Sequence, residues 1–211
     1  MYLSRVELDT SKKQTQVALV SPNKFHGAIE NAFDYAKENR TRNLWRIDKL
    51  NGKMYLLLVS KDKPDLTNFA RQFGKKLLSY ETKEYGRFID KLSNETVWQF
   101  RLIANPTKCV KKEKGRGKRV AHITPEHQTQ WLIKQAQKYG FHVDEKRVQV
   151  KESKWLMFNK QGKHMVRALA VTYEGKLEIT DVDKFRIALV DGIGREKAYG
   201  MGLLTIVRME L

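Results

Sequence analysis

The chain has 211 residues, of which 41 are Lys or Arg and 24 are Asp or Glu, so its formal net charge is +17. No apolar stretch reaches the roughly 18 residues that a membrane-spanning helix needs, and we expect neither a secretory signal nor a membrane partner. The single cysteine, Cys109, excludes an internal disulfide. This composition predicts a cytoplasmic protein with an anionic partner, for which nucleic acid is the best fit.

The first half of the chain predicts four strands and two helices. Residues 2–9 alternate as a half-buried strand, and Ser21 with Pro22 marks the start of a helix whose apolar stripe runs from Phe25 to Ala36. Strands at 44–48 and 54–59 are joined by Asn51-Gly52, a strong hairpin signal. A helix at 65–73 and a strand near 76–90 complete the order βαββαβ, which is typical of a ferredoxin-like domain.

The second half predicts a similar unit. A strand at 97–104 precedes a helix that Thr124 caps and Gly140 ends. Extended segments follow near 141–150, 153–159, 164–173 and 177–180, then a short helix at 182–190 and a closing strand. We therefore predict an α+β protein of two tandem ferredoxin-like (RRM-like) domains. Residues 1–91 carry His26, and residues 92–211 carry a basic hairpin.

Four glycines close to the C-terminus form a second signal: Gly192, Gly194, Gly200 and Gly202. Arg195 and Lys197 lie between the two pairs, so the loop is predicted to offer N–H donors and positive charge to a phosphate. A dinucleotide fingerprint is excluded, because its third glycine would fall at Lys197 and too few residues remain for a βαβ unit.

Two basic segments are predicted to contact RNA. The denser one contains Lys108, Lys111, Lys112, Arg116, Lys118 and Arg119, and we interpret it as a mobile arm along a phosphate backbone. The alternative is a solvated loop that aids solubility. The second segment is the hairpin around residues 160–164, where Lys154, Lys160, Lys163 and Arg167 are expected to enter an RNA groove.

His26 is the main catalytic candidate. It lies at the margin of the apolar stripe, so packing holds its backbone while the imidazole reaches solvent, and histidine exchanges a proton near neutral pH. Lys24 precedes it by two residues. The alternative is an ordinary helical histidine without a chemical role. The five histidines have no metal-ligand spacing, and we expect no metal, no cofactor and no small-molecule ligand.

Several segments in this order resemble one family. The chain is similar to CasE, the CRISPR-repeat endoribonuclease subunit of the type I-E Cascade complex. The matching pieces are Met1-Tyr2-Leu3-Ser4, His26, Leu44-Trp45-Arg46, Phe100 to Lys108, Gly117 to Val120 and Gly192 to Thr205. The resemblance spans nearly the whole chain.

The resemblance implies a fold, an activity and partners. It implies two ferredoxin-like domains and metal-independent cleavage at the base of a repeat stem-loop in CRISPR precursor RNA, through attack by a ribose 2′-OH. The mature crRNA would stay bound, and other Cascade subunits would assemble on it. His26 would supply acid or base, and Lys24 would stabilise the phosphorane, helped by Arg195, Lys197 or the loop amides. Members of the family carry a tyrosine where this chain has Asn23, which puts a tyrosine-assisted mechanism in doubt and leaves Asn23 as an RNA contact.

Three alternatives remain open from the residues alone. The first is a non-catalytic, structural RNA-binding subunit, although the RRM aromatic signature is absent from the predicted central strands. The second is a basic structural protein of the ribosomal kind. The third is a metal-dependent nuclease, which the lack of a tight acidic cluster beside a histidine disfavours.

Overall fold

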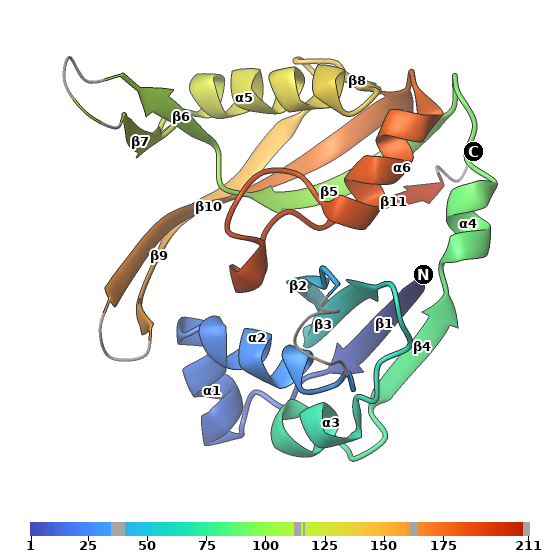
Figure 1. The fold of residues 1–211 in the computed structure, drawn as a ribbon, viewed down its shortest axis with the longest axis vertical. Helices are drawn as coiled ribbons and strands as arrows, with labels where there is room; N and C mark the ends of the chain where they lie inside the picture. The colour runs from blue at the N-terminus through green and yellow to red at the C-terminus, as the bar shows by residue number, and fades with distance from the viewer. Residues whose placement is uncertain (35–40, 112–114, 116, 161–163, 209–211) are drawn as a thin grey trace.

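The computed structural model describes residues 1–34, 41–111, 115, 117–160 and 164–208. Its first half contains β1 (Tyr2–Glu7), α1 (Lys13–Val20), α2 (Asn23–Glu30), β2 (Leu44–Leu50), β3 (Lys53–Ser60), α3 (Thr67–Phe73), β4 (Tyr80–Glu84) and α4 (Gly86–Asp90). The four strands form one antiparallel sheet in the order β2-β3-β1-β4. Helices α1, α2 and α3 lie on one side of this sheet, and the second half of the chain lies on the other (Figure 1).

The second half contains β5 (Val97–Ala104), β6 (Thr107–Val110), β7 (Lys118–Ala121), α5 (Pro125–Lys138), β8 (Phe141–Val143), β9 (Gln149–Lys160), β10 (His164–Ile179), α6 (Val182–Asp191), the 3-10 turn η2 (Lys197–Tyr199) and β11 (Leu204–Arg208). Its sheet has the order β11-β5-β10-β8, and β9 also pairs with β10. Both sheets have the strand order of a ferredoxin-like fold, so the predicted fold class is confirmed.

The predicted hairpin at Asn51-Gly52 is confirmed, but the predicted first helix is only partly correct. Asn51 and Gly52 have φ of 49° and 76°, as a tight turn between β2 and β3 requires. The predicted helix at residues 22–36 instead starts at Asn23, has Pro22 as its N-cap without a side-chain cap bond, and ends at Glu30. The predicted Ser21 cap is therefore wrong.

The short helix α1 was not predicted from the sequence, and its packing explains why. Only Thr15 and Ala18 are buried in it, while Val17 and Val20 are 44% and 71% exposed. Such a helix lacks the apolar stripe on which sequence-based prediction depends. Its position against α2 and α3 stabilises it instead.

The two halves share part of their core. One cluster fills the space between the first sheet and its helices, and includes Phe25, Phe69 and Phe73. A second cluster includes Leu44 and Val59 from the first sheet together with side chains of β5, α5 and α6. Each fully buried side chain of this size contributes about 1.5–3 kcal/mol, so this shared packing joins the two sheets.

A buried arginine completes the junction between the sheets. Arg46, on β2, is 1% exposed, and its guanidinium donates to both carboxylate oxygens of Asp48 at 2.9 and 2.7 Å. It also donates to the carbonyl oxygens of Arg101 and Leu203 at 2.8 and 3.0 Å and to Thr205 Oγ1 at 2.8 Å. One side chain of the first half is thereby bonded to β5 and to the segment leading into β11.

Candidate active site

His26 lies on the partly exposed side of α2. Its neighbours Phe25 and Ile29 are 1% and 0% exposed, and the Phe25 ring centroid lies 4.9 Å from that of Phe73 and 5.8 Å from that of Trp45. These contacts hold the helix while the His26 side chain remains 38% exposed. The position agrees with the prediction of a packed backbone and an accessible imidazole.

A carboxylate that sequence reasoning missed lies beside the imidazole. Glu30 Oε1 is 4.0 Å from His26 Nδ1, and the same oxygen accepts a hydrogen bond from Asn43 Nδ2 at 3.3 Å. Asn43 is only 7% exposed, so it holds the carboxylate in place. The i,i+4 spacing of His26 and Glu30 on a helix is the sequence signal that predicts this pair.

The glycine-rich loop reaches from the second half to this helix. The loop follows α6, and its η2 turn packs against both α2 and the start of β2 (Figure 1). The N–H of Ile193 donates to the carbonyl oxygen of Gly202 at 2.9 Å, which closes the neck of the loop. The fold therefore brings α2, the helix that carries His26, into contact with the η2 turn, more than 160 positions later in the sequence.

Close packing accounts for the glycines of the loop. Gly200 has a φ of +80°, and a Cβ there would lie 2.9 Å from Cζ3 of Trp45. Gly192, with a φ of +73°, faces Leu44 equally closely, and a Cβ at Gly194 would lie 3.2 Å from the Trp131 ring. All four glycines have a positive φ, which glycine adopts most readily, and at three of them the neighbouring tryptophans and leucine leave little room for a side chain.

The loop also keeps donors for an anion. The amide groups of Gly194 and Arg195 donate to no acceptor within the described ranges of the chain, and the Arg195 side chain is exposed. Unsatisfied amides beside a guanidinium are the components of a phosphate-binding site.

Lys197 is hydrogen-bonded to the last residue of α6. Its Nζ donates to the carbonyl oxygen of Asp191 at 2.5 Å. Burial, and then the neighbouring charge of Arg42, lowers the pKa of Lys197, with Lys138 adding to the effect and Asp191 opposing it. Arg42 and Lys138 are basic residues of this region that the sequence did not single out, because they are distant from the glycine block in the sequence.

Lys24 and Asn23 are the two other predicted site residues on α2. Lys24 is exposed and lies two positions before His26, a spacing at which helical side chains do not face each other. Asn23 has its Oδ1 buried without a hydrogen-bond partner in the described part of the protein. The predicted contact of Asn23 with RNA and the catalytic role of Lys24 stay predictions.

The two ends of the predicted basic arm pair with each other as a β-hairpin. In it, β6 pairs with β7, and Lys108, Lys111, Lys118 and Arg119 are all exposed. The register opposes Cys109 to Arg119 and Val110 to Lys118, so Lys108 and Lys118 share one face and Arg119 lies on the other. Lys112 and Arg116 lie outside the described residues. Figure 1 shows this hairpin projecting from the second half.

The second predicted basic hairpin divides its charges between two faces. Phe158 and Lys154 share the face that packs on the loop, where the Phe158 ring lies 4.8 Å from that of Tyr199. Arg167 is on the opposite face, over the Trp155 ring at 4.4 Å. Lys163 and the side chain of Lys160 lie outside the described part. Lys154 and Arg167 therefore lie on opposite faces of the hairpin, and their contact with RNA stays a prediction.

The fold and the site define a basic protein of two joined ferredoxin-like units, with a histidine helix held against a glycine-rich loop. The sequence model of the family described as CRISPR associated protein matches residues 1–208, so the chain belongs to that family.

Comparison with individual proteins agrees with this assignment. The chain is 28% identical, over 98% of its length and 99% of the relative's, to the CRISPR-associated endoribonuclease Cse3 of Thermus thermophilus. It matches a Cse3 structure bound to 19 nt RNA with a TM-score of 0.83 and 27% identity, covering 99% and 100% of the two chains. The structure of Thermus thermophilus Cse3 bound to an RNA representing a pre-cleavage complex matches with a TM-score of 0.82 and 26% identity, covering 98% of each chain. Cse3 is another name for CasE, so the resemblance to CasE predicted from the sequence is confirmed.

No described helix is long and apolar enough to cross a membrane. Within the same residues, no three His, Cys, Asp or Glu side chains gather as metal ligands would.

Proposed function

We propose that this protein is an endoribonuclease that binds the stem-loop of a CRISPR repeat and cleaves the precursor RNA at the base of the stem, with His26 as its catalytic residue. The observation that carries the proposal is the packing of α2, the helix that bears His26 and is anchored by Phe25 and Ile29, against the η2 turn of a loop whose Gly194 and Arg195 amides have no acceptor among the described residues. The similarity to Cse3, a CRISPR endoribonuclease with structures bound to RNA, supports the substrate class.

The reaction in this proposal is an internal transesterification. The 2′-oxygen attacks the adjacent phosphorus and loses its proton, and the 5′-oxygen of the next nucleotide leaves and gains a proton. The products are a 2′,3′-cyclic phosphate and a 5′-hydroxyl. His26 transfers one or both protons, and the amides of Gly194 and Arg195 with the Arg195 side chain stabilise the charge that develops on the phosphoryl oxygens.

The exposed lysines of β6 and β7, and Lys154 on the loop side of β9, are the proposed contacts to the stem. Double-stranded RNA is recognised largely by shape and phosphate contacts, which suits such a set of cations. We further propose that the cleaved stem stays bound, that other Cascade subunits assemble on this product, and that the reaction takes place in the cytoplasm.

The test is cleavage of a labelled repeat RNA in excess EDTA by wild type, His26→Ala and His142→Ala. His142 is an exposed histidine of β8 and serves as the matched control. We expect His26→Ala to lose about 10²–10⁴-fold in the single-turnover rate with its affinity for the RNA retained, and His142→Ala to match wild type.

Other outcomes overturn parts of the proposal. Binding without cleavage by wild type, with or without divalent metal, would leave a structural RNA-binding subunit. Cleavage that EDTA abolishes would replace the mechanism by a metal-dependent one. Equal cleavage by wild type and His26→Ala would keep the substrate and reject the site.

A further inference from the structure

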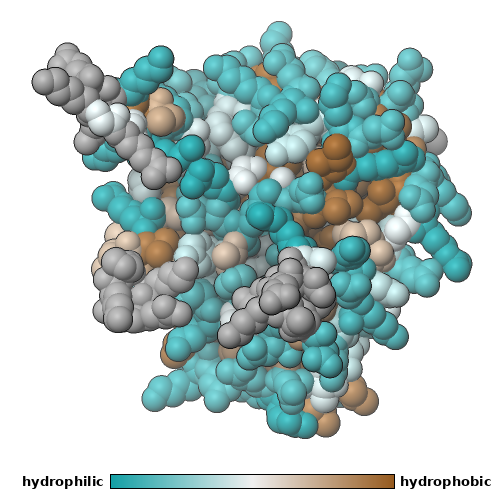
Figure 2. Space-filling view, viewed as in Figure 1, coloured by the Kyte–Doolittle hydropathy of each residue, from teal (hydrophilic) through white to brown (hydrophobic). Residues whose placement is uncertain are grey.

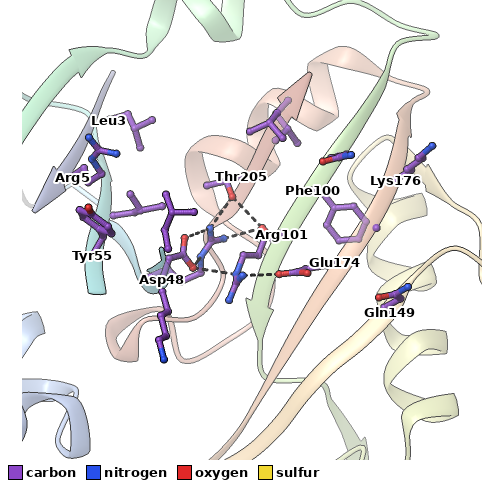
Figure 3. Close-up of a pocket in the computed structure, with 18 of the residues that line it drawn as sticks. Leu3, Arg5, Asp48, Tyr55, Phe100, Arg101, Gln149, Glu174, Lys176 and Thr205 are labelled. Atoms are coloured by element: carbon purple, nitrogen blue, oxygen red, sulfur yellow. Dashed lines mark hydrogen bonds and ion pairs between the residues drawn. The ribbon is translucent and has the colours of Figure 1, made fainter. Parts of the chain in front are cut away.

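A recess lies between the two sheets, apart from the glycine-rich loop. Its volume is about 1180 Å³, and Leu3, Arg5, Tyr55 and Leu57 of the first sheet face Arg101, Lys176 and Thr205 of the second across it (Figure 3). This volume exceeds the roughly 300–1,000 Å³ of small-molecule pockets. The recess, called here the interdomain cleft, therefore has the size of a site for part of a polymer.

The cleft is a fixed feature, because the junction of the sheets forms its floor. Arg101 Nε lies 3.1 Å from Asp48 Oδ1 and its NH1 lies 2.6 Å from Glu174 Oε1, and Asp48 is also bonded to Arg46. Figure 3 shows this chain of contacts from one sheet to the other. Both carboxylates that line the cleft are thereby neutralised by arginines.

The remaining charge of the cleft is positive. Its lining contains seven cations and two carboxylates: Arg5, Arg46, Lys49, Arg101, Lys146, Arg147 and Lys176, with Asp48 and Glu174. Lys49, Lys146 and Lys176 are exposed and have no ion-pair partner among the residues described. They come from β2, from the turn between β8 and β9, and from β10, so both sides of the cleft carry positive charge, which favours a polyanion.

Apolar side chains between these cations suit nucleobases. Leu50 and Val207 are 55% and 58% exposed, and the guanidinium of Arg5 lies 5.1 Å from the centroid of the Tyr55 ring. A cationic groove that also offers apolar, aromatic and guanidinium surfaces is the arrangement that binds single-stranded RNA with little sequence preference. The face shown in Figure 2 is mostly hydrophilic, with apolar side chains gathered near α6.

Strand β2 connects the cleft to the candidate active site. Its first residues pack against η2, and Asp48, Lys49 and Leu50 at its other end line the cleft. Seven residues of strand span about 20 Å. An RNA strand that leaves the stem base at His26 is thus tethered close to the cleft, where a high effective concentration makes weak contacts count.

We propose that the interdomain cleft binds the single-stranded RNA that flanks the repeat stem. This inference rests on the proposed function, since the flank belongs to the same RNA. Lys49, Lys146 and Lys176 contact its phosphates, while Tyr55 and the apolar side chains contact its bases. An acid-rich polypeptide segment also fits the positive charge of the cleft, and it is the competing occupant that the test distinguishes from RNA.

The test compares three RNAs that share a stem-loop which wild type cleaves, each with a 2′-deoxy nucleotide at the scissile position. One is the stem-loop alone, and the others carry ten uridines on its 5′ or its 3′ side. The proteins are wild type, the triple variant Lys49→Gln, Lys146→Gln, Lys176→Gln, and a control triple of exposed lysines outside the cleft, Lys61→Gln, Lys76→Gln, Lys91→Gln.

We expect one uridine flank to tighten binding to wild type and to the control triple about tenfold. The cleft triple should lose this gain. For the flanked RNA only, the slope of log K against log[salt] should become smaller in magnitude by roughly 2, because each of the three single-strand phosphate contacts contributes about 0.7. A 4-thiouridine in the flank should crosslink to the peptide that contains Tyr55.

The proposal is overturned if neither flank tightens binding to wild type, which would leave the cleft to a polypeptide. It is also overturned if the cleft triple loses as much affinity for the stem-loop alone, or if the control triple behaves like the cleft triple. Cleavage of the unmodified stem-loop by all three proteins tests the proposed function separately, because the flank plays no part in it.

Discussion

At the level of single residues, the proposed activity depends on what orients the imidazole of His26. Glu30 lies 4.0 Å from its Nδ1 and is held by the buried Asn43. A carboxylate at this position restricts the orientation of the ring, and a small loss of orientation at a reacting centre lowers the rate substantially.

We predict that Glu30→Ala lowers the single-turnover cleavage rate about tenfold and leaves the Kd for uncleavable RNA unchanged. Glu30→Gln should lose less, because its amide oxygen still accepts the bond from Asn43. Quench-flow or manual time courses measure both, with the exposed Glu178→Ala as control. A rate unaffected by Glu30→Ala would show that the carboxylate does not position His26.

At the scale of elements, the glycine-rich loop is defined by its contacts with β2. Its four glycines could be identified from the sequence, but the sequence could not reveal that Trp45 and Trp131 are what a side chain would meet. Lys197, which the sequence predicts as a phosphate contact, donates a hydrogen bond to the carbonyl oxygen of Asp191 at the end of α6, and its contact with RNA stays a prediction. Such long-range contacts leave no periodic signal along the chain.

Two glycine substitutions should have opposite effects on stability. Gly200→Ala places a Cβ at a φ of +80° and 2.9 Å from Trp45, so we expect a loss of about 1–3 kcal/mol and slower cleavage. Gly27→Ala, within α2 and with nothing within 4 Å, should gain about 0.5–1 kcal/mol. Urea denaturation measures both. Equal stability of Gly200→Ala and wild type would contradict the packing of the loop.

At the scale of the whole molecule, two repeated folds act as one body. The strand orders of both sheets were predictable, because alternating strands, the Asn51-Gly52 turn and the Thr124 cap are local signals. The joining of the sheets was not predictable, because Arg46 reads as one more surface cation until its partners Asp48, Arg101 and Leu203 are known. The interdomain cleft follows from this junction and was missed for the same reason.

Removing Arg46 should destabilise the protein strongly. Arg46→Ala leaves the partly buried carboxylate of Asp48 with Arg101 alone, and breaking a buried charge network costs roughly 3–5 kcal/mol. Adding Asp48→Asn should restore part of this loss, because the uncompensated charge is then removed. Denaturation midpoints in urea test both variants. A loss below about 1 kcal/mol for Arg46→Ala would mean that the junction is stabilised by apolar packing instead.

The central claim is cleavage by an attacking 2′-oxygen at the site of His26. The most direct measurement is single-turnover cleavage of a repeat RNA with one 2′-deoxy nucleotide at the scissile position, with mass analysis of the ends formed from the unmodified RNA. We expect the modified RNA to bind with unchanged affinity and not to be cut, and the unmodified RNA to yield a 2′,3′-cyclic phosphate and a 5′-hydroxyl. Cleavage of the modified RNA at the same position would contradict it, because the nucleophile would then be water.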